Sequence, residues 1–252
     1  MSDISEGKLP DSIAEFWGVR ERAGKGPKPG LSLERIVDAA IAVASMDGIS
    51  AVSMNRVATE LGTSAMSLYR YVRAKDELLV LMVDTALGAM PPIPADGEDW
   101  REALETCAWY YHHALLRHPW TLRVPISGPP MTPNQLRWLE NGLTALRGTG
   151  LAEHEKMSVL LLLSSFVRIE ATLMLDIAST AEATGTKPEE IMPAYGRTIA
   201  HLAPKDQFPA LHAVIEAGVF ARADDPDDEF IFGLNRILDG IEVLIRSRLA
   251  ER

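Results

Sequence analysis

The sequence predicts an all-α protein in two parts, a small basic module followed by a larger, acidic helical bundle. Apolar residues recur at spacings of three and four along most of the chain beyond residue 30, with no convincing strand pattern. The net charge is −10, yet residues 17–75 hold nine Lys/Arg and five Asp/Glu. The segment "PPIP" at 91–94 interrupts the helical pattern. We therefore place one domain at 31–90 and a second at 91–252.

The basic module begins with a long helix and a short one. Ser32 is a plausible N-cap for the first helix, and Gly48 lies just past its end. The second helix, within "SMNRVATELG" at 53–62, ends at Gly62. The first helix carries an apolar stripe made of Leu33, Ile36, Val37, Ala40, Ile41 and Ala44.

The third helix, within "TSAMSLYRYVRAKDEL" at 63–78, has two unlike faces. At 100° per residue, Ala65, Leu68 and Val72 fall on one side, and the opposite side carries Met66, Ser67, Arg70 and Tyr71. The second and third helices, joined by the turn at Gly62 and braced by the first helix, form a helix-turn-helix arrangement, and the outward side of the third helix fits a DNA major groove. A fourth helix follows from about 74 to 90. We expect base contacts from Ser67, Arg70 and Tyr71, and phosphate contacts from Tyr69, Arg73 and Lys75.

The stretch from Leu33 to Leu79 contains the pattern LG-x5-LYRYV-x2-K-x-EL, which starts at Leu61. With this pattern the stretch resembles the TetR family of bacterial transcriptional repressors. The resemblance implies a homodimer that binds a palindromic operator in double-stranded DNA and is released by a small-molecule inducer. Carried over position by position, the family's DNA contacts are Ser53, Asn55, Arg56, Ser64, Ala65, Ser67, Tyr69, Arg70, Tyr71 and Lys75.

The acidic part is expected to hold helices near 99–118, 133–147, 153–183, 188–202, 207–220 and 227–250. Its "HPW" at 118–120 and the stretch 129–151 resemble the ligand domain of tetracycline-type repressors. Aromatic and apolar walls with a few polar groups suit a small, mostly apolar ligand, although each such residue taken singly is more typical of an ordinary core. The candidate ligand-binding residues are Trp109, Tyr110, His113, Trp138, Met157, Leu161, Phe166, Arg168 and Glu170.

Arg168 and Glu170 interrupt the most apolar stretch, "MSVLLLLSSFVRIEATLMLDI" at 157–177. This run has about the length of a membrane span, but charges at membrane depth cost on the order of 3 kcal/mol each, so we expect a soluble bundle and no membrane partner. The two side chains need partners from the protein, a ligand or a second subunit.

Two helices, at 153–183 and 227–250, are the candidates for dimerisation, because each carries a wide apolar stripe. The alternative is that both stripes fill the core of one subunit. Two-fold symmetry would let two modules read half-sites about 34 Å apart.

Residues 1–30 are expected to form a flexible basic arm. Its end, "RERAGKGPKPG" at 20–30, has three glycines and two prolines among basic residues. Such an arm could lie along a DNA minor groove, or it could be a disordered start without a role.

Other classes of function find little support in the sequence. The single cysteine, Cys107, excludes an intrachain disulfide and suits a reducing cytoplasm, where it is a small buried hydrophobe or a redox sensor. His112 and His113 point about 100° apart on a helix, so no metal site is expected, and no cofactor is implied. No catalytic set is evident, so we expect a protein that is not an enzyme. The alternatives are a helical enzyme or small-molecule-binding protein, or an interaction scaffold, with an incidental N-terminal module.

Overall fold

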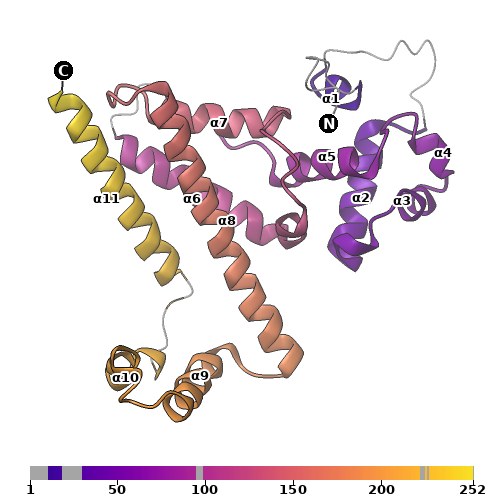
Figure 1. Cartoon of the computed structure of the whole chain (residues 1–252). Helices are drawn as coiled ribbons and strands as arrows, with labels where there is room; N and C mark the ends of the chain where they lie inside the picture. Colours follow the sequence, from indigo (N-terminus) through magenta and orange to yellow (C-terminus); the bar gives the residue numbers. More distant parts are fainter. Residues whose placement is uncertain (1–10, 19–29, 95–98, 222–224, 226, 252) are drawn as a thin grey trace.

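The computed structural model describes residues 11–18, 30–94, 99–221, 225 and 227–251, and these residues form helices and connecting turns without a strand. Figure 1 shows a helical module near the N-terminus, a central bundle, and a small lobe at the far end of the longest helix. The helices are α1 (Asp11–Phe16), α2 (Leu33–Asp47), α3 (Met54–Glu60), α4 (Ala65–Leu68), α5 (Lys75–Leu87), α6 (Trp100–Arg117), α7 (Pro133–Ala145), α8 (Glu153–Thr184), α9 (Pro188–Leu202), α10 (Pro209–Glu216) and α11 (Asp228–Ala250). Short 3-10 turns, η2 (Ile49–Ala51), η3 (Pro119–Arg123) and η4 (Val219–Ala221), complete the set.

The N-terminal module is built on α2, as its apolar stripe predicts. Ile36, Val37 and Ala40 are buried against Val57 of α3 and Leu68 of α4. Helix starts are fixed locally, since three serine side chains accept hydrogen bonds from the backbone N–H three residues later: Ser32 at α2, Ser53 at α3 and Ser64 at α4.

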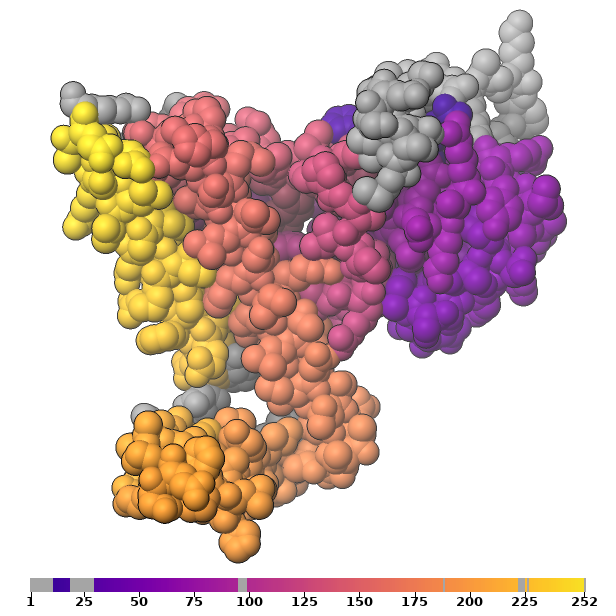
Figure 2. Space-filling view, in the orientation of Figure 1, coloured from indigo at the N-terminus to yellow at the C-terminus, as the bar shows by residue number. Residues whose placement is uncertain are grey.

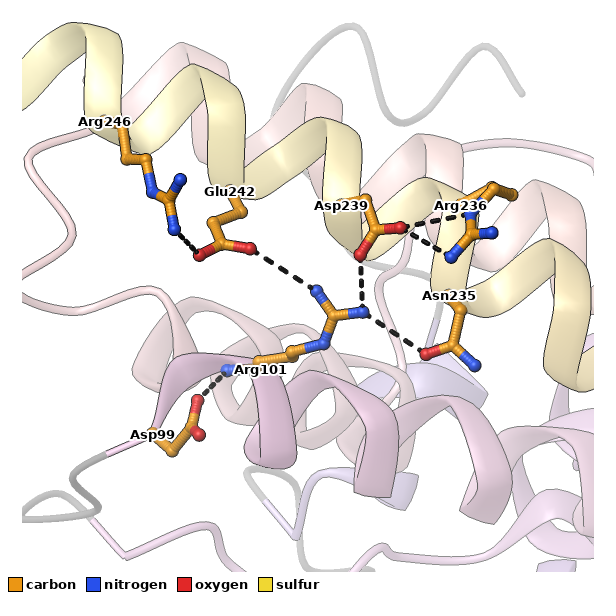
Figure 3. Close-up of polar contacts among 7 residues, drawn as sticks. All are labelled: Asp99, Arg101, Asn235, Arg236, Asp239, Glu242 and Arg246. Carbon is orange, nitrogen blue, oxygen red and sulfur yellow. Dashed lines mark hydrogen bonds and ion pairs between the residues drawn. The ribbon is translucent and has the colours of Figure 1, made fainter.

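The central bundle packs α6, α7, α8 and α11 around a second core. Phe230 of α11 is fully buried there, with Leu104 of α6 and Val167 of α8. A polar network joins α6 to α11 (Figure 3). In it, Arg101 donates to Asp239 Oδ1 at 2.8 Å and to Asn235 Oδ1 at 3.2 Å. The network holds α11 alongside α6.

The lobe formed by α9, α10 and η4 extends from the end of α8, away from the N-terminal module (Figures 1 and 2). Phe220 lies so close to the α9 backbone that a Cβ at Gly196 would be 2.7 Å from it, so glycine is needed for this contact. Leu202 is 70% exposed and Tyr195 51%. The lobe therefore carries apolar side chains that a single chain does not bury.

Several predicted boundaries were wrong. Residues 11–16 form α1, although the whole of 1–30 was expected to be a flexible arm; residues 20–29 of the basic segment lie outside the described residues. The third helix is shorter than expected, since beyond Leu68 the N–H of Tyr71 bonds back only three residues, to the Leu68 carbonyl. The helix expected at 207–220 divides at Gly218, whose φ of 72° ends α10.

Candidate functional site

The α3–α4 pair forms the core of the predicted site. Gly62, with a φ of 63°, makes the turn between the helices, and the N–H of Thr63 bonds to the Ala58 carbonyl at 2.9 Å. Leu68 and Val72 are fully buried, which confirms the predicted inward face. Ala65 is half-buried and packs against the same core.

The outward side of the pair carries polar side chains. Ser53, Asn55, Ser64, Arg70 and Lys75 are exposed, Tyr69 is 45% exposed, and Ser67 is half-buried with its Oγ 3.0 Å from that of Ser64. We call these seven residues the recognition surface: Ser53, Asn55, Ser64, Ser67, Tyr69, Arg70 and Lys75.

Two predicted DNA contacts are placed differently. Tyr71 does not lie on the outward face: it is half-buried against the core, and its hydroxyl donates to the Leu31 carbonyl at 2.8 Å. Arg56 is bound by Glu60 at 2.7 Å and Asp47 at 3.2 Å, and these hydrogen bonds raise the pKa of its guanidinium. Arg56 therefore joins α3 to the end of α2, and we leave both residues out of the recognition surface.

Helix α1 lies beside this module. Arg73, an expected phosphate contact, is paired with Asp11 at 2.8 Å, and Ser12 donates to Glu77 at the start of α5. Ile13 is 6% exposed and joins the module core. Just beyond α1, Trp17 Nε1 donates to the Met131 carbonyl at 2.9 Å, so the segment bridges the module and the loop before α7.

The candidate ligand residues fall into separate groups. Trp109, Tyr110 and His113 line a shallow site of about 350 Å³ along α6, together with Glu102, Glu105 and Thr106. The Trp109 ring stacks on His113 with centroids 5.3 Å apart. We call Trp109, Tyr110 and His113 the aromatic patch.

Arg168 and Glu170 find their partners within the protein. Arg168 donates to the carbonyls of Thr121, Leu122 and Val124 at 3.1–3.2 Å, which ties α8 to η3. Glu170 Oε2 lies 2.7 Å from Nε2 of His112, which is 1% exposed, and the Nδ1 of this imidazole has no partner among the described residues.

The remaining candidates lie on α7 and α8. Trp138 donates to the Gly88 carbonyl at 2.9 Å and so joins α7 to the end of α5. Phe166 stacks on Phe230 in the bundle core. Met157 and Leu161 are 46% and 69% exposed on α8. Phe230 also contacts the rings of Trp109 and His112, the partner of Glu170, so the core brings Trp109, Phe166 and Glu170 together. Trp138 lies at the contact of α7 with α5, and Met157 and Leu161 are exposed on α8.

Comparison with known proteins decides the family. Residues 36–82 match the model described as "Bacterial regulatory proteins, tetR family", and residues 93–245 match "Tetracyclin repressor-like, C-terminal domain". The chain belongs to the TetR family. This TetR-family chain is 37% identical to the HTH-type transcriptional repressor DrrR1 of Streptomyces coeruleorubidus over 97% of its own length and 90% of the relative.

Solved TetR-family structures have the same fold. Apo ActR from Streptomyces coelicolor is 29% identical, with a TM-score of 0.69 over 87% of this chain and 99% of ActR. ActR in complex with actinorhodin is 28% identical, with a TM-score of 0.68 over 85% of this chain and 96% of that one. These relatives identify the chain as a TetR-family transcriptional repressor.

Sequence reasoning missed a buried carboxylate in this regulator. Asp84 of α5 is 1% exposed; its Oδ1 accepts from Thr132 Oγ1 at 2.5 Å and from the Gln135 N–H at 2.9 Å. Burial raises the pKa of Asp84, against the opposing effect of these hydrogen bonds. Asp84, although 48–51 residues away in the sequence, thus accepts the hydrogen bonds of the first turn of α7 and joins α5 to the bundle. An acidic residue in the apolar pattern of α5 was the available signal.

Cys107 is buried in α6, as a small hydrophobe would be, and burial raises the pKa of its thiol to about 12. Within the described ranges, no three His, Cys, Asp or Glu side chains gather closely enough to hold a metal ion.

Proposed function

We propose that the chain is a cytoplasmic repressor that binds a palindromic operator as a homodimer and is released by a small, mostly apolar molecule. The observation that carries the proposal is the recognition surface, which presents hydroxyls, an amide and two cations on the side of the α3–α4 pair opposite the buried Leu68 and Val72. In a chain of net charge −10, a locally basic surface favours DNA contact through this module alone.

Within the recognition surface, we assign Ser67 and Arg70 to base edges, because they lie at the outward end of α4 and the following turn. We assign Tyr69 and Lys75 to phosphates, with Ser53 and Asn55 of α3 in support.

Dimerisation is proposed through α8 and α11. Ile169 and Leu173 of α8 are 69% and 60% exposed, and Val243 of α11 is 68% exposed. Among the described helices, α8 is the one long and apolar enough to cross a membrane. Arg168 and Glu170 near its middle already hold partners in the protein, so a second subunit explains the exposed apolar side chains better than lipid.

For the effector, we propose binding beside the aromatic patch, where Trp109 and His113 stack and Tyr110 is 42% exposed. The solved complex of ActR with actinorhodin supports a small-molecule effector for this chain. Such a ligand would shift the population of the dimer towards a state with wrongly spaced modules.

The test is selection of bound sequences from random duplex DNA by purified protein at near-physiological salt. We expect an inverted repeat, and we expect Arg70→Ala to lose it while Arg197→Ala, an exposed arginine on α9, recovers it. An interaction scaffold or an enzyme predicts no enrichment from folded protein, including protein refolded to remove any bound ligand.

The two kinds of contact are separable on the selected operator. Arg70→Ala should reduce the free energy of operator binding by about 1–3 kcal/mol and lower the specificity at one base pair. Lys75→Ala should weaken binding to all sequences alike and reduce the slope of log affinity against log salt concentration by about one. If the two variants behave alike, the division into base and phosphate contacts is wrong.

A further inference from the structure

A groove separates the N-terminal module from the bundle on one side. It has a volume of about 540 Å³, within the range of about 300–1,000 Å³ that small-molecule sites occupy. The module contributes the end of α2 and η2, and the bundle contributes η3 and the second half of α8. We call it the junction groove; its lining includes Ser45, Ile49, Arg117, Trp120, Leu175 and Glu182.

Two polar groups of the lining lack partners. Arg117 is exposed at the end of α6 and makes no hydrogen bond or ion pair with the described part of the chain. Trp120 is 6% exposed, and its indole N–H is buried with no acceptor among the described residues. Arg117 is therefore open to a ligand in the groove, whereas the Trp120 N–H has no exposed surface and the indole can contribute only apolar contact.

The charge of the lining favours an anion. Arg123 is paired with Asp176, and Glu182 is the one carboxylate among the lining residues, so the attraction for an anion rests on the exposed Arg117. The pKa of the neighbouring His118 is lowered mainly by burial and, to a smaller extent, by the positive charge of Arg117.

The walls of the groove are apolar and include a large ring. Ile49 comes from the module, Trp120 and Leu122 come from η3, and Leu175 comes from α8. Such walls suit a flat hydrocarbon skeleton, and the hydroxyls of Ser45, Thr172 and Ser179 leave lone pairs for a donor on the ligand.

From this geometry we propose that the junction groove is a second effector site, separate from the aromatic patch, for a small planar aromatic anion such as an aromatic carboxylate. The carboxylate pairs with Arg117, and the ring lies against Trp120 and Leu175.

The position of the groove gives its ligand a regulatory role. A bound molecule touches α2, which supports α3 and α4, and also α8 of the bundle, so it stabilises one placement of the module. Operator and ligand then alter each other's affinity by the same factor. This consequence rests on the proposed operator binding, whereas occupation of the groove does not.

The test uses 2-naphthoate and its uncharged counterpart of similar shape, 2-naphthamide, in calorimetric titrations of the full chain. We expect naphthoate to bind with about tenfold preference over the amide, and Arg117→Gln to remove that preference. Ser45→Trp on α2 and Ala178→Trp on α8 each fill the groove from one wall and should abolish binding. Both positions are exposed, so the variants should fold, which circular dichroism checks.

The matched control is Tyr110→Ala in the aromatic patch, which should leave naphthoate binding unchanged. No binding by folded wild-type protein, or binding lost in Tyr110→Ala but retained in both tryptophan variants, would overturn the proposal. Operator titrations with and without naphthoate then test the coupling: binding without any change in operator affinity refutes it. Failure to find an operator refutes the proposed function and leaves the calorimetric result standing.

Discussion

Asp84 provides the sharpest test of how the module is held to the bundle. Replacing it by alanine removes the acceptor of the Thr132 hydroxyl, which is fully buried, and of the Gln135 N–H. Each buried donor left without an acceptor costs about 1–3 kcal/mol. Part of this loss is offset, because the variant no longer has to bury a carboxylate. We therefore expect Asp84→Ala to lower the free energy of unfolding by about 2–4 kcal/mol at neutral pH.

Asp84→Asn separates the charge from the hydrogen bonds. The amide oxygen can still accept from Thr132 and Gln135, so this variant should lose much less stability than Asp84→Ala.

The pH dependence has a defined sign, since the folded pKa of Asp84 is raised above the ordinary value of 3.8. The folded state binds the proton more tightly, so the stability that this group contributes is fully present below pH 3.8 and is lost as the pH rises through the raised folded pKa. Wild-type protein should therefore gain stability relative to Asp84→Asn on acidification.

The assay is urea denaturation at one fixed protein concentration, because the stability of a dimer depends on concentration. A double-mutant cycle with Thr132→Val should give a coupling energy between about 0.5 and 3 kcal/mol. The reasoning fails if Asp84→Ala lies within about 0.5 kcal/mol of wild type, which is the range of neutral surface changes.

Three further substitutions test packing by the same denaturation assay. Leu68→Ala, at a fully buried position, should lower the free energy of unfolding by about 2–5 kcal/mol, and a loss under about 1 kcal/mol would mean that α4 is not anchored as described. Gly233→Ala places a Cβ 2.5 Å from a phenylalanine ring and should cost about 1–3 kcal/mol, whereas Gly240→Ala on the same helix meets open space and should cost nothing; equal effects would contradict the close contact. Glu170→Leu leaves Nε2 of buried His112 without its partner and should cost about 1–3 kcal/mol; an unchanged free energy of unfolding would mean that this pair does not stabilise the contact of α6 with α8.

The N-terminal module could be predicted from sequence because its determinants are local. The α2 stripe, the serine caps and the turn at Gly62 each involve residues a few positions apart, and the structure contains all of them. Tyr71 was misplaced because its position depends on a bond to Leu31, 40 residues away, which no periodicity indicates.

The bundle was predictable as helices but not as a binding site. Arg168 and Glu170 are two residues apart and so point to different neighbours, η3 and α6, neither of which the pattern of α8 identifies. Asp84 and Thr132 are 48 residues apart, so their bond was likewise invisible in the sequence. Helix α1 was missed because six residues have little helical stability of their own and depend on the burial of Ile13.

The bridge formed by α1 and Trp17 restrains the N-terminal module against the loop before α7. A form that started after residue 18 would keep both domains but lose the bond to Met131 and the pairing of Asp11 with Arg73. Arg73 would then be more available to phosphate, and the module would be less restrained against α7. The segment that pairs with Arg73 thus also limits how far the module can move against the bundle.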